Sequence, residues 1–217
     1  MIEAYPFPNA FFRQKEPASP FVGEFEVPEQ WWSRRHEYTW ARTYAAAGQI
    51  VADMGCGWHY RPLHDWLAQV CEFTYGVDSH KGILDLPPMT RGEFVVANFA
   101  ARIEAIPEAS LDRVFCISVL EELIDYQKAL AEFKRLLKPD GLIIMTCDAP
   151  FIKDKPTPVY PGVDMDKLEK AISDTGLIYK GSVNRTRYDD LLHHAEWNLA
   201  VWHCVIKKSV RPKEEHG

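Results

Sequence analysis

Short apolar runs alternate with helical stretches along most of this chain, and this alternation restricts the possible folds more than any other feature. Five runs have the character of buried strands: 49–53, 73–78, 93–97, 111–117 and 142–146. Apolar residues at helical spacing, or strong helix formers, occupy 61–70, 121–138 and 165–174. Strands that alternate with helices form crossover units around a mainly parallel sheet. The sequence therefore predicts an α/β fold.

Two regions depart from this alternation. The late strands expected at 177–183 and 199–207 are joined without a helix, so we expect an antiparallel pair at one edge of the sheet. Residues 1–30 contain five prolines and five phenylalanines, which predicts an irregular arm packed on the domain. A helix is expected over 29–47, with Gly48 ending it.

Composition narrows the class of protein. The 217 residues suffice for one domain, and no apolar run reaches the roughly 18 residues of a membrane span. The start of the chain lacks the features of a signal peptide. The net charge of −6 disfavours nucleic acid as a partner. The five dispersed cysteines form no CxxC pair, which favours the cytoplasm and predicts no metal site.

The run from Val51 to Gly57 reads Val-Ala-Asp-Met-Gly-Cys-Gly, in which a buried strand delivers Asp53 to a turn with two glycines. Glycines let the backbone approach a ligand closely, although a tight turn alone would also explain them. The next strand ends at Asp78, where a carboxylate can accept both hydroxyls of a ribose. Tyr60 replaces the last glycine of a dinucleotide fingerprint, and Asp53 repels phosphate. A ligand with a cationic end and no phosphate fits this pattern.

Five segments in order resemble the motifs of class I S-adenosylmethionine-dependent methyltransferases: 53–57, 76–78, 111–115, 118–123 and 137–142. The resemblance covers roughly residues 48–207. It implies a Rossmann-like, doubly wound sheet of seven strands, mostly parallel with a reversed final strand, and S-adenosyl-L-methionine as the cofactor. Three positions depart from the family pattern: His59 stands at a frequent third glycine, Asn98 at a common Asp, and Glu122 at a common His.

The resemblance also implies a set of cofactor-binding residues. Gly55, Cys56 and Gly57 would line the methionine and ribose part, with Asp53 near the sulfonium or amino end. Asp78 would bind the ribose hydroxyls, and Ser79, Asn98 and Phe99 would meet the adenine. Ile117 and Ser118 would meet the methionine moiety.

The catalytic residues are less defined by the sequence. Methyl transfer depends largely on alignment, although an oxygen nucleophile also benefits from a general base. We consider His59, Asp148 and the neighbours His193 and His194 as candidates for that base. His59 could instead cap the following helix, and the paired histidines could be solvated.

The stretch from Trp31 to Arg42 is rich in tryptophan and arginine. It can form a helix whose tryptophans cover the edge of the sheet, or a lid that closes over the site and excludes water. In the second case Arg35 or Arg42 would pair with the cofactor carboxylate, and Tyr38 would donate a hydrogen bond.

Together these features predict an enzyme that transfers a methyl group from S-adenosylmethionine to an O, N or C atom of a small molecule. A methyltransferase acting on RNA or protein and a non-catalytic cofactor-binding subunit remain alternatives, and a nicotinamide dehydrogenase is disfavoured by the missing glycine. We expect an arm and cap helix at 1–47, the methyltransferase domain at 48–209 and a disordered tail at 210–217. The sequence does not specify an oligomeric state.

Overall fold

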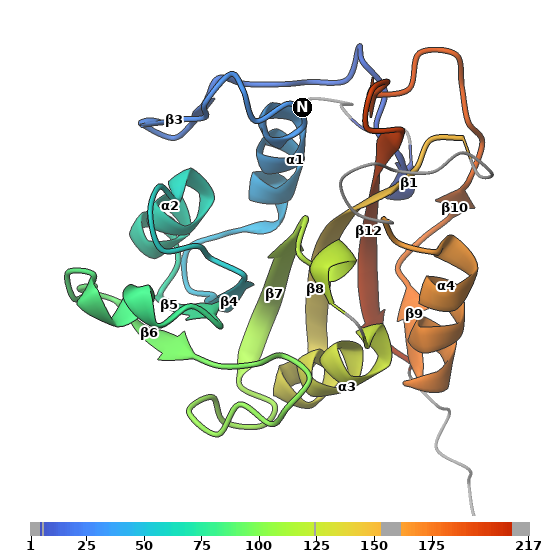
Figure 1. Ribbon diagram of the computed structural model, residues 1–217. Helices are drawn as coiled ribbons and strands as arrows, with labels where there is room; N and C mark the ends of the chain where they lie inside the picture. Colours follow the sequence, from blue (N-terminus) through green and yellow to red (C-terminus); the bar gives the residue numbers. More distant parts are fainter. Residues whose placement is uncertain (1–4, 6, 124, 153–161, 210–217) are drawn as a thin grey trace, which may run out of the picture.

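The computed structural model describes residues 5, 7–123, 125–152 and 162–209, and it shows a twisted sheet with helices on both faces (Figure 1). Parallel strands stand in the order β6–β5–β4–β7–β8, and β12 continues the sheet antiparallel to β8. Their bounds are β4 (Ile50–Met54), β5 (Phe73–Asp78), β6 (Gly92–Val96), β7 (Leu111–Ile117), β8 (Leu137–Pro150) and β12 (Leu199–Lys208). The mostly parallel sheet with a reversed final strand is confirmed.

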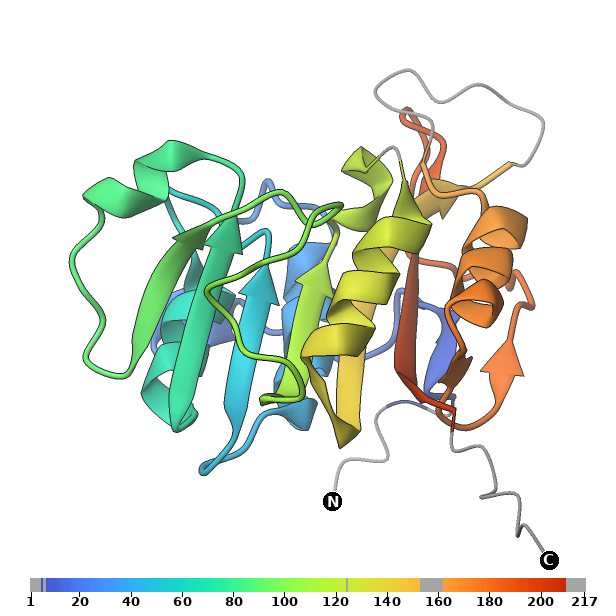
Figure 2. The ribbon, with the colours of Figure 1, turned by 90° about the horizontal axis from the view of Figure 1, so that it is seen from below.

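Each face of the sheet is covered by one pair of helices (Figure 2). The helices α1 (Arg34–Ala41) and α2 (Pro62–Val70) pack on one face through buried apolar side chains such as Trp40 and Leu67. On the other face lie α3 (Tyr126–Leu136) and α4 (Met165–Asp174), which bury Phe133 and Leu168. Because β7 and β8 are covered on both faces, most of their residues are buried, as expected for central strands of a parallel sheet.

The outer edge of β12 is shared by three short strands. β9 (Leu177–Tyr179), β1 (Asn9–Phe11) and β11 (His193–His194) each pair antiparallel with a different part of it, and β10 (Val183–Asn184) pairs with β1. The antiparallel pair expected from the late strands is thus present as β9 and β12. The run predicted as one strand over 177–183 is split, because its two parts pair with different partners.

The N-terminal arm is more regular than predicted. Its strand β1 belongs to the main sheet, where the Asn9 side chain accepts a hydrogen bond from the Val205 amide at 2.8 Å. Two further strands, β2 (Phe21–Val22) and β3 (Phe25–Glu26), form a small hairpin. An uncovered edge of β12 would present unpaired backbone groups, and the arm supplies partners for them.

The helices match the prediction with shorter bounds. The helix expected over 29–47 is α1 followed by the 3-10 turn η1 (Arg42–Tyr44). The helix expected over 121–138 begins only at Tyr126, because Asp125 caps it by accepting a hydrogen bond from the Lys128 amide. Two short 3-10 turns, η2 (Lys81–Asp85) and η3 (Leu120–Glu122), follow β5 and β7.

Part of the loop expected at 148–163, and the predicted disordered tail at 210–217, lie outside the described residues. Within the described ranges, no helix combines the length and apolar character needed to cross a membrane.

Candidate cofactor and acceptor site

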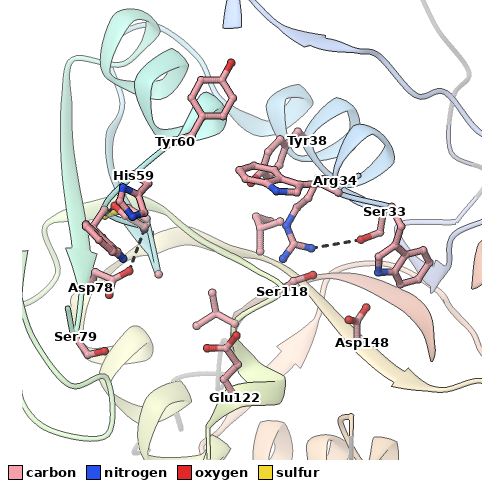
Figure 3. Close-up of a pocket in the computed structure, with 18 of the residues that line it drawn as sticks. Ser33, Arg34, Tyr38, His59, Tyr60, Asp78, Ser79, Ser118, Glu122 and Asp148 are labelled. Carbon is pink, nitrogen blue, oxygen red and sulfur yellow. Dashed lines mark hydrogen bonds between the residues drawn. The ribbon is translucent and has the colours of Figure 1, made fainter. Parts of the chain in front are cut away.

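A cavity of about 650 Å³ opens at the carboxyl ends of the parallel strands, next to the start of α1 (Figure 3). Most of the predicted site residues line it: Gly55, Cys56, Gly57, His59, Asp78, Ser79, Phe99, Ile117, Ser118 and Asp148. Asp53, Asn98 and His193 are not among its lining residues. This position agrees with the rule that open α/β sheets bind ligands beyond the carboxyl ends of their strands.

The glycine loop after β4 forms one wall with its backbone. Gly55 has a φ of 81°, and its amide donates a hydrogen bond to the Val77 carbonyl at 2.7 Å. A Cβ at Gly55 would lie 2.3 Å from Cγ2 of Val119, whereas a Cβ at Gly57 would meet nothing within 4 Å. The loop therefore needs glycine at 55 for close packing, and it presents the backbone of residue 57 to open space.

Asp78 stands at the end of β5 with its carboxylate held in place. Oδ2 accepts a hydrogen bond from the Gly57 amide at 3.0 Å (Figure 3), and Oδ1 accepts one from the His80 amide at 2.9 Å. Two backbone donors fix the orientation of this carboxylate, and each of its oxygens has a second acceptor position for a diol.

Two predicted cofactor residues face elsewhere. The Asp53 carboxylate lies 3.4 Å from Nδ1 of His64 on α2 and is 5% exposed. The exposed Asn98 accepts a hydrogen bond from the Ala100 amide at 2.9 Å and so closes its own turn. Phe99, the neighbour of Asn98, is the member of that pair that lines the cavity.

A buried network joins α1 to the ends of β7 and β8. Glu37 is fully buried, and its Oε2 accepts hydrogen bonds from the hydroxyls of Ser118, at 2.7 Å, and Thr146. Its Oε1 pairs with Nη1 of Arg34 at 2.7 Å. Burial alone would raise the pKa of Glu37, but Arg34 and the hydroxyl donors hold it below its ordinary value.

Ser118 itself has a φ of 48°, an uncommon value for a residue other than glycine. Its amide donates to both the carbonyl and the hydroxyl oxygen of Thr146, at 3.1 Å each. These bonds, together with the bond to Glu37, stabilise the strained backbone at the turn that follows β7.

Arg34 is the arginine of α1 that lines the cavity, and its side chain is 26% exposed (Figure 3). Of the two arginines considered from the sequence, Arg35 turns away and donates from Nε to the Val27 carbonyl at 3.2 Å, and Arg42 is not among the lining residues. Tyr38 lines the cavity as expected, and burial raises the pKa of its phenol, so that the hydroxyl stays protonated. The spacing of Arg34 and Glu37, three residues apart on one helix, was the available sequence signal.

The histidines considered as bases separate into two groups. His59 is exposed at the rim of the cavity, and it does not cap α2, whose first turn has no side-chain cap. His193 stacks on Phe151 at 4.2 Å between ring centroids, and its Nδ1 lies 2.9 Å from the Leu191 carbonyl. His194 packs between Trp197, at 4.0 Å, and Trp32, at 5.7 Å between ring centroids.

Asp148 lines the cavity from β8, whereas Asp78 lies on β5. The two strands are three positions apart in the sheet order β8–β7–β4–β5. With strands about 4.8 Å apart, this corresponds to roughly 14 Å between the two strands. Asp148 is 2% exposed, and its amide donates to Oε1 of Glu121 at 3.3 Å. Trp32 and Trp197 line the cavity as well. We call the region around Asp148, Trp32 and Trp197 the acceptor end, and the region around the glycine loop and Asp78 the cofactor end.

The residues present suit S-adenosylmethionine better than a metal. The open cradle over Gly57, beside a fixed carboxylate that can receive two hydroxyls, matches a ribose. Arg34 offers a cation for a carboxylate at the other side of the loop. Across the described residues, no three His, Cys, Asp or Glu side chains come together in a group that could hold a metal ion.

Comparison with known proteins agrees with this geometry. Residues 52–145 match the family model described as a methyltransferase domain. A relative from Mycolicibacterium smegmatis, named "Probable S-adenosylmethionine-dependent methyltransferase", is 29% identical over 163 residues, which cover 66% of this chain and 58% of the relative. The chain thus spans about three fifths of the length of the curated relatives it matches.

Solved structures share the fold. The [4+2]-cyclase SpnF superposes with a TM-score of 0.63 at 14% identity, over 90% of both chains. The 1,6-didemethyltoxoflavin-N1-methyltransferase of Burkholderia thailandensis, solved with its namesake substrate and S-adenosylhomocysteine, gives 0.58 at 18% identity, over 82% of this chain and 79% of that one. The family match over residues 52–145 and the sheet order together support a class I S-adenosylmethionine-dependent methyltransferase domain.

Proposed function

We propose that this protein binds S-adenosylmethionine and transfers its methyl group to a small molecule. The observation that carries the proposal is the Asp78 carboxylate, which is fixed by two backbone amides next to the open backbone of Gly57. A ribose diol bound there would place the rest of the cofactor between the glycine loop and the end of β7. The family match over residues 52–145 supports the same ligand.

The remaining contacts follow from the order of the lining residues. Ser79 and Phe99 lie beyond Asp78 and would meet the adenine, while Ile117 and Ser118 would meet the methionine moiety. The Arg34 guanidinium, oriented by Glu37, would pair with the cofactor carboxylate. When bound, the cofactor supplies a methyl group on a cationic sulfur, which is open to direct attack by a nucleophile.

A small molecule suits the remaining space. The cavity volume lies within the usual range for small-molecule sites, and its acceptor end is walled by the indoles of Trp32 and Trp197. The chain carries a net charge of −6, which disfavours RNA. The Burkholderia relative is named for methylating a nitrogen of a small molecule, and this chain could act on an O, N or C atom.

We further propose residues 48–209 as the methyltransferase domain and 1–47 as its arm and cap, which supplies Arg34 and Trp32.

The protein's own residues would align the acceptor and exclude water. Trp32, Arg34 and Tyr38 come from the arm and helix α1 and close one side of the cavity. Asp148 and His59 are the candidate bases that line the cavity, and Asp148 is the buried one.

The five cysteines are buried and free, all within the described part of the chain, which supports a reducing compartment such as the cytoplasm.

Calorimetry with S-adenosylhomocysteine tests the proposal. We expect one site per chain and displacement of the bound ligand by S-adenosylmethionine, with no competition from NAD. Mass spectrometry of reactions with S-adenosylmethionine and a panel of amines, phenols, alcohols and carbon acids then detects methylated products.

The two measurements separate the alternatives. An intact protein that fails to bind S-adenosylhomocysteine contradicts the proposal outright. Binding without turnover of any member of a metabolite panel would instead favour a non-catalytic subunit or a fold put to other chemistry, as the name of the SpnF cyclase illustrates.

A further inference from the structure

The Ser118 side chain stands between the cavity and a buried carboxylate. Ser118 lines the cavity, and its hydroxyl donates a hydrogen bond to Oε2 of Glu37 at 2.7 Å. Glu37 is fully buried and is not among the lining residues, so it lies behind the cavity wall. A serine hydroxyl has one proton and two lone pairs. Because the proton of Ser118 is given to Glu37, its Oγ is left to accept hydrogen bonds from a group in the cavity.

The direction of this hydrogen bond is fixed by the charge of Glu37. Its Oε1 accepts from Nη1 of Arg34 at 2.7 Å, and its Oε2 accepts from the hydroxyls of Ser118 and Thr146. Although burial opposes it, Arg34 and these hydroxyl donors hold the pKa of Glu37 below its ordinary value. An ionised carboxylate only accepts hydrogen bonds. A hydroxyl that donates to it becomes a stronger acceptor itself, because bonds in a chain polarise one another.

The same carboxylate holds a cation at the cavity wall. Arg34 lines the cavity, and its Nη1 also donates to Oγ of Ser33 at 3.4 Å (Figure 3). A guanidinium has five N–H donors, so donors remain for a ligand beside those that Glu37, Ser33 and Tyr38 receive. Since Arg34 and Ser118 contact the two oxygens of one carboxylate group, a donor-only cation and an acceptor-only hydroxyl are neighbours on the wall.

Resting on the function proposed above, we propose that Ser118 accepts a hydrogen bond from the ammonium group at the methionine end of the cofactor, and that Glu37 is its positioning residue. Glu37 also positions Arg34 for the carboxylate on the same carbon. The wall thus recognises a zwitterion. The ion pair of Arg34 and Glu37 is neutral as a whole, and a ligand end with one charge of each sign leaves the net charge of the site unchanged.

The turn that carries Ser118 lies where this end of the cofactor would pass. Val119, the next residue, packs so closely on the glycine loop that a Cβ at Gly55 would lie 2.3 Å from its Cγ2. The backbone of Ser118 is held at a φ of 48° by the two bonds from its amide to Thr146. A strained residue held by several bonds at a cavity wall is typical of a ligand-binding position.

Calorimetry with three adenosine thioethers tests the proposal on the whole protein without any acceptor. The ligands are S-adenosylhomocysteine, its deaminated analogue in which thiobutyrate replaces homocysteine, and methylthioadenosine, which lacks both charged groups. We expect S-adenosylhomocysteine to bind roughly tenfold more tightly than the deaminated analogue, as one hydrogen bond to a charged group provides. Methylthioadenosine should bind more weakly still, because it also loses the bond to Arg34.

Glu37→Gln separates positioning from a merely structural role. The substitution keeps the shape of the side chain and removes its charge. We expect the affinity for S-adenosylhomocysteine to fall roughly tenfold or more, and the affinity for methylthioadenosine to change less than about threefold. A structural role alone would weaken both ligands equally, and that result would overturn the assignment of Glu37.

Ser118→Ala and Thr146→Val form a matched pair. Each removes one hydroxyl that donates to Glu37, but Thr146 is fully buried and does not line the cavity. Ser118→Ala should bind S-adenosylhomocysteine and its deaminated analogue equally, whereas Thr146→Val should keep the wild-type ratio of the two affinities. A wild-type ratio in Ser118→Ala would overturn the proposal. If Glu37→Gln does not fold, this pair still decides the role of Ser118.

The three ligands keep this proposal separate from the proposed function. A wild-type protein that binds neither S-adenosylhomocysteine nor methylthioadenosine contradicts the function. A wild-type protein that binds S-adenosylhomocysteine and its deaminated analogue equally supports cofactor binding and overturns the role of Ser118 alone.

Discussion

The cofactor end of the cavity is bounded by the backbone of one short loop and one carboxylate, whereas the acceptor end is bounded by side chains from α1, η3, β8 and the turn before β12. At the cofactor end, Gly55, Gly57 and Asp78 follow two strands that are neighbours in the sheet. Behind the rest of the cavity wall, Glu37 and Thr146 meet across 109 positions of sequence. The first end is therefore encoded locally, and the second exists only once the whole sheet has formed.

The largest expected effect falls on the cofactor end. Asp78→Ala removes a carboxylate that would accept two hydrogen bonds from the ribose, which costs about 4 kcal/mol, or roughly 1,000-fold in affinity for S-adenosylhomocysteine. Calorimetry measures the change. Asp148→Asn, at the acceptor end, should alter the same affinity only a few-fold. Equal losses in both variants would remove the distinction between the two ends.

Arg34→Met tests the buried network that joins α1 to the ends of β7 and β8. The substitution leaves the fully buried Glu37 without its cation. We expect a loss of about 3 kcal/mol in the free energy of unfolding, at the low end for a broken buried pair because Arg34 is partly exposed.

The neighbouring arginine supplies the control. Arg35→Met removes one hydrogen bond to a backbone carbonyl and should cost about 1 kcal/mol. Denaturant unfolding of both variants compares them directly. Similar losses would show that Glu37 does not depend on Arg34.

A pH-dependent effect is expected where the N-terminal arm packs on β12. His203 is fully buried against the rings of Phe12 and Trp40, and burial lowers its pKa to about 3. As the pH falls below about 6.5, the unfolded chain takes up a proton that the folded protein cannot, so stability falls. The contribution is about 2 kcal/mol between pH 6.5 and 5.

His203→Phe should remove this part of the pH dependence, whereas His80→Gln, at an exposed site, should keep the wild-type slope. Urea unfolding at several pH values measures both, and the difference between each variant and the wild type isolates one group. A wild-type slope in His203→Phe would contradict the prediction. Hydrogen exchange can then show whether acid loosens β12 and the acceptor end before the glycine loop.

The smallest expected difference separates two variants of the glycine loop. Gly55→Ala and Gly57→Ala both place a side chain at a positive φ, at a cost of roughly 1–2 kcal/mol each. Gly55→Ala also drives a methyl group into Val119, so it should be the more destabilising by about 1 kcal/mol. Thermal unfolding ranks the two variants, and the reverse order would mean that the loop shifts freely away from Val119.

The sequence was sufficient to predict those parts of the molecule whose residues lie close together along the chain. The strand that delivers Asp53, the glycine loop and the carboxylate at Asp78 occur where their spacing predicts them. The sheet order and the reversed β12 follow from the same pattern together with the family resemblance.

The acceptor end could not be predicted in this way. Arg34 and Arg35 are adjacent and chemically alike, and only the packing of α1 decides which one faces the cavity. Glu121 reads as a helix residue, but the cap at Asp125 delays the helix and leaves Glu121 buried beside a strand from farther along the chain. The strand β1 was missed because its apolar residues lie among prolines and its partner is nearly 200 positions away.

The place of β12 between β8 and β1 sets an order of assembly during synthesis. Ala10 pairs with His203, so the arm leaves the ribosome long before the strand that receives it. Until β12 inserts, β1 and the buried ring of Phe12 have no sheet to join, and the chain carries an apolar segment that other chains can contact. A chaperone that covers this segment until β12 has been synthesised should therefore raise the yield of folded protein. We expect this effect on yield to be larger than that of changes in the parallel half of the sheet.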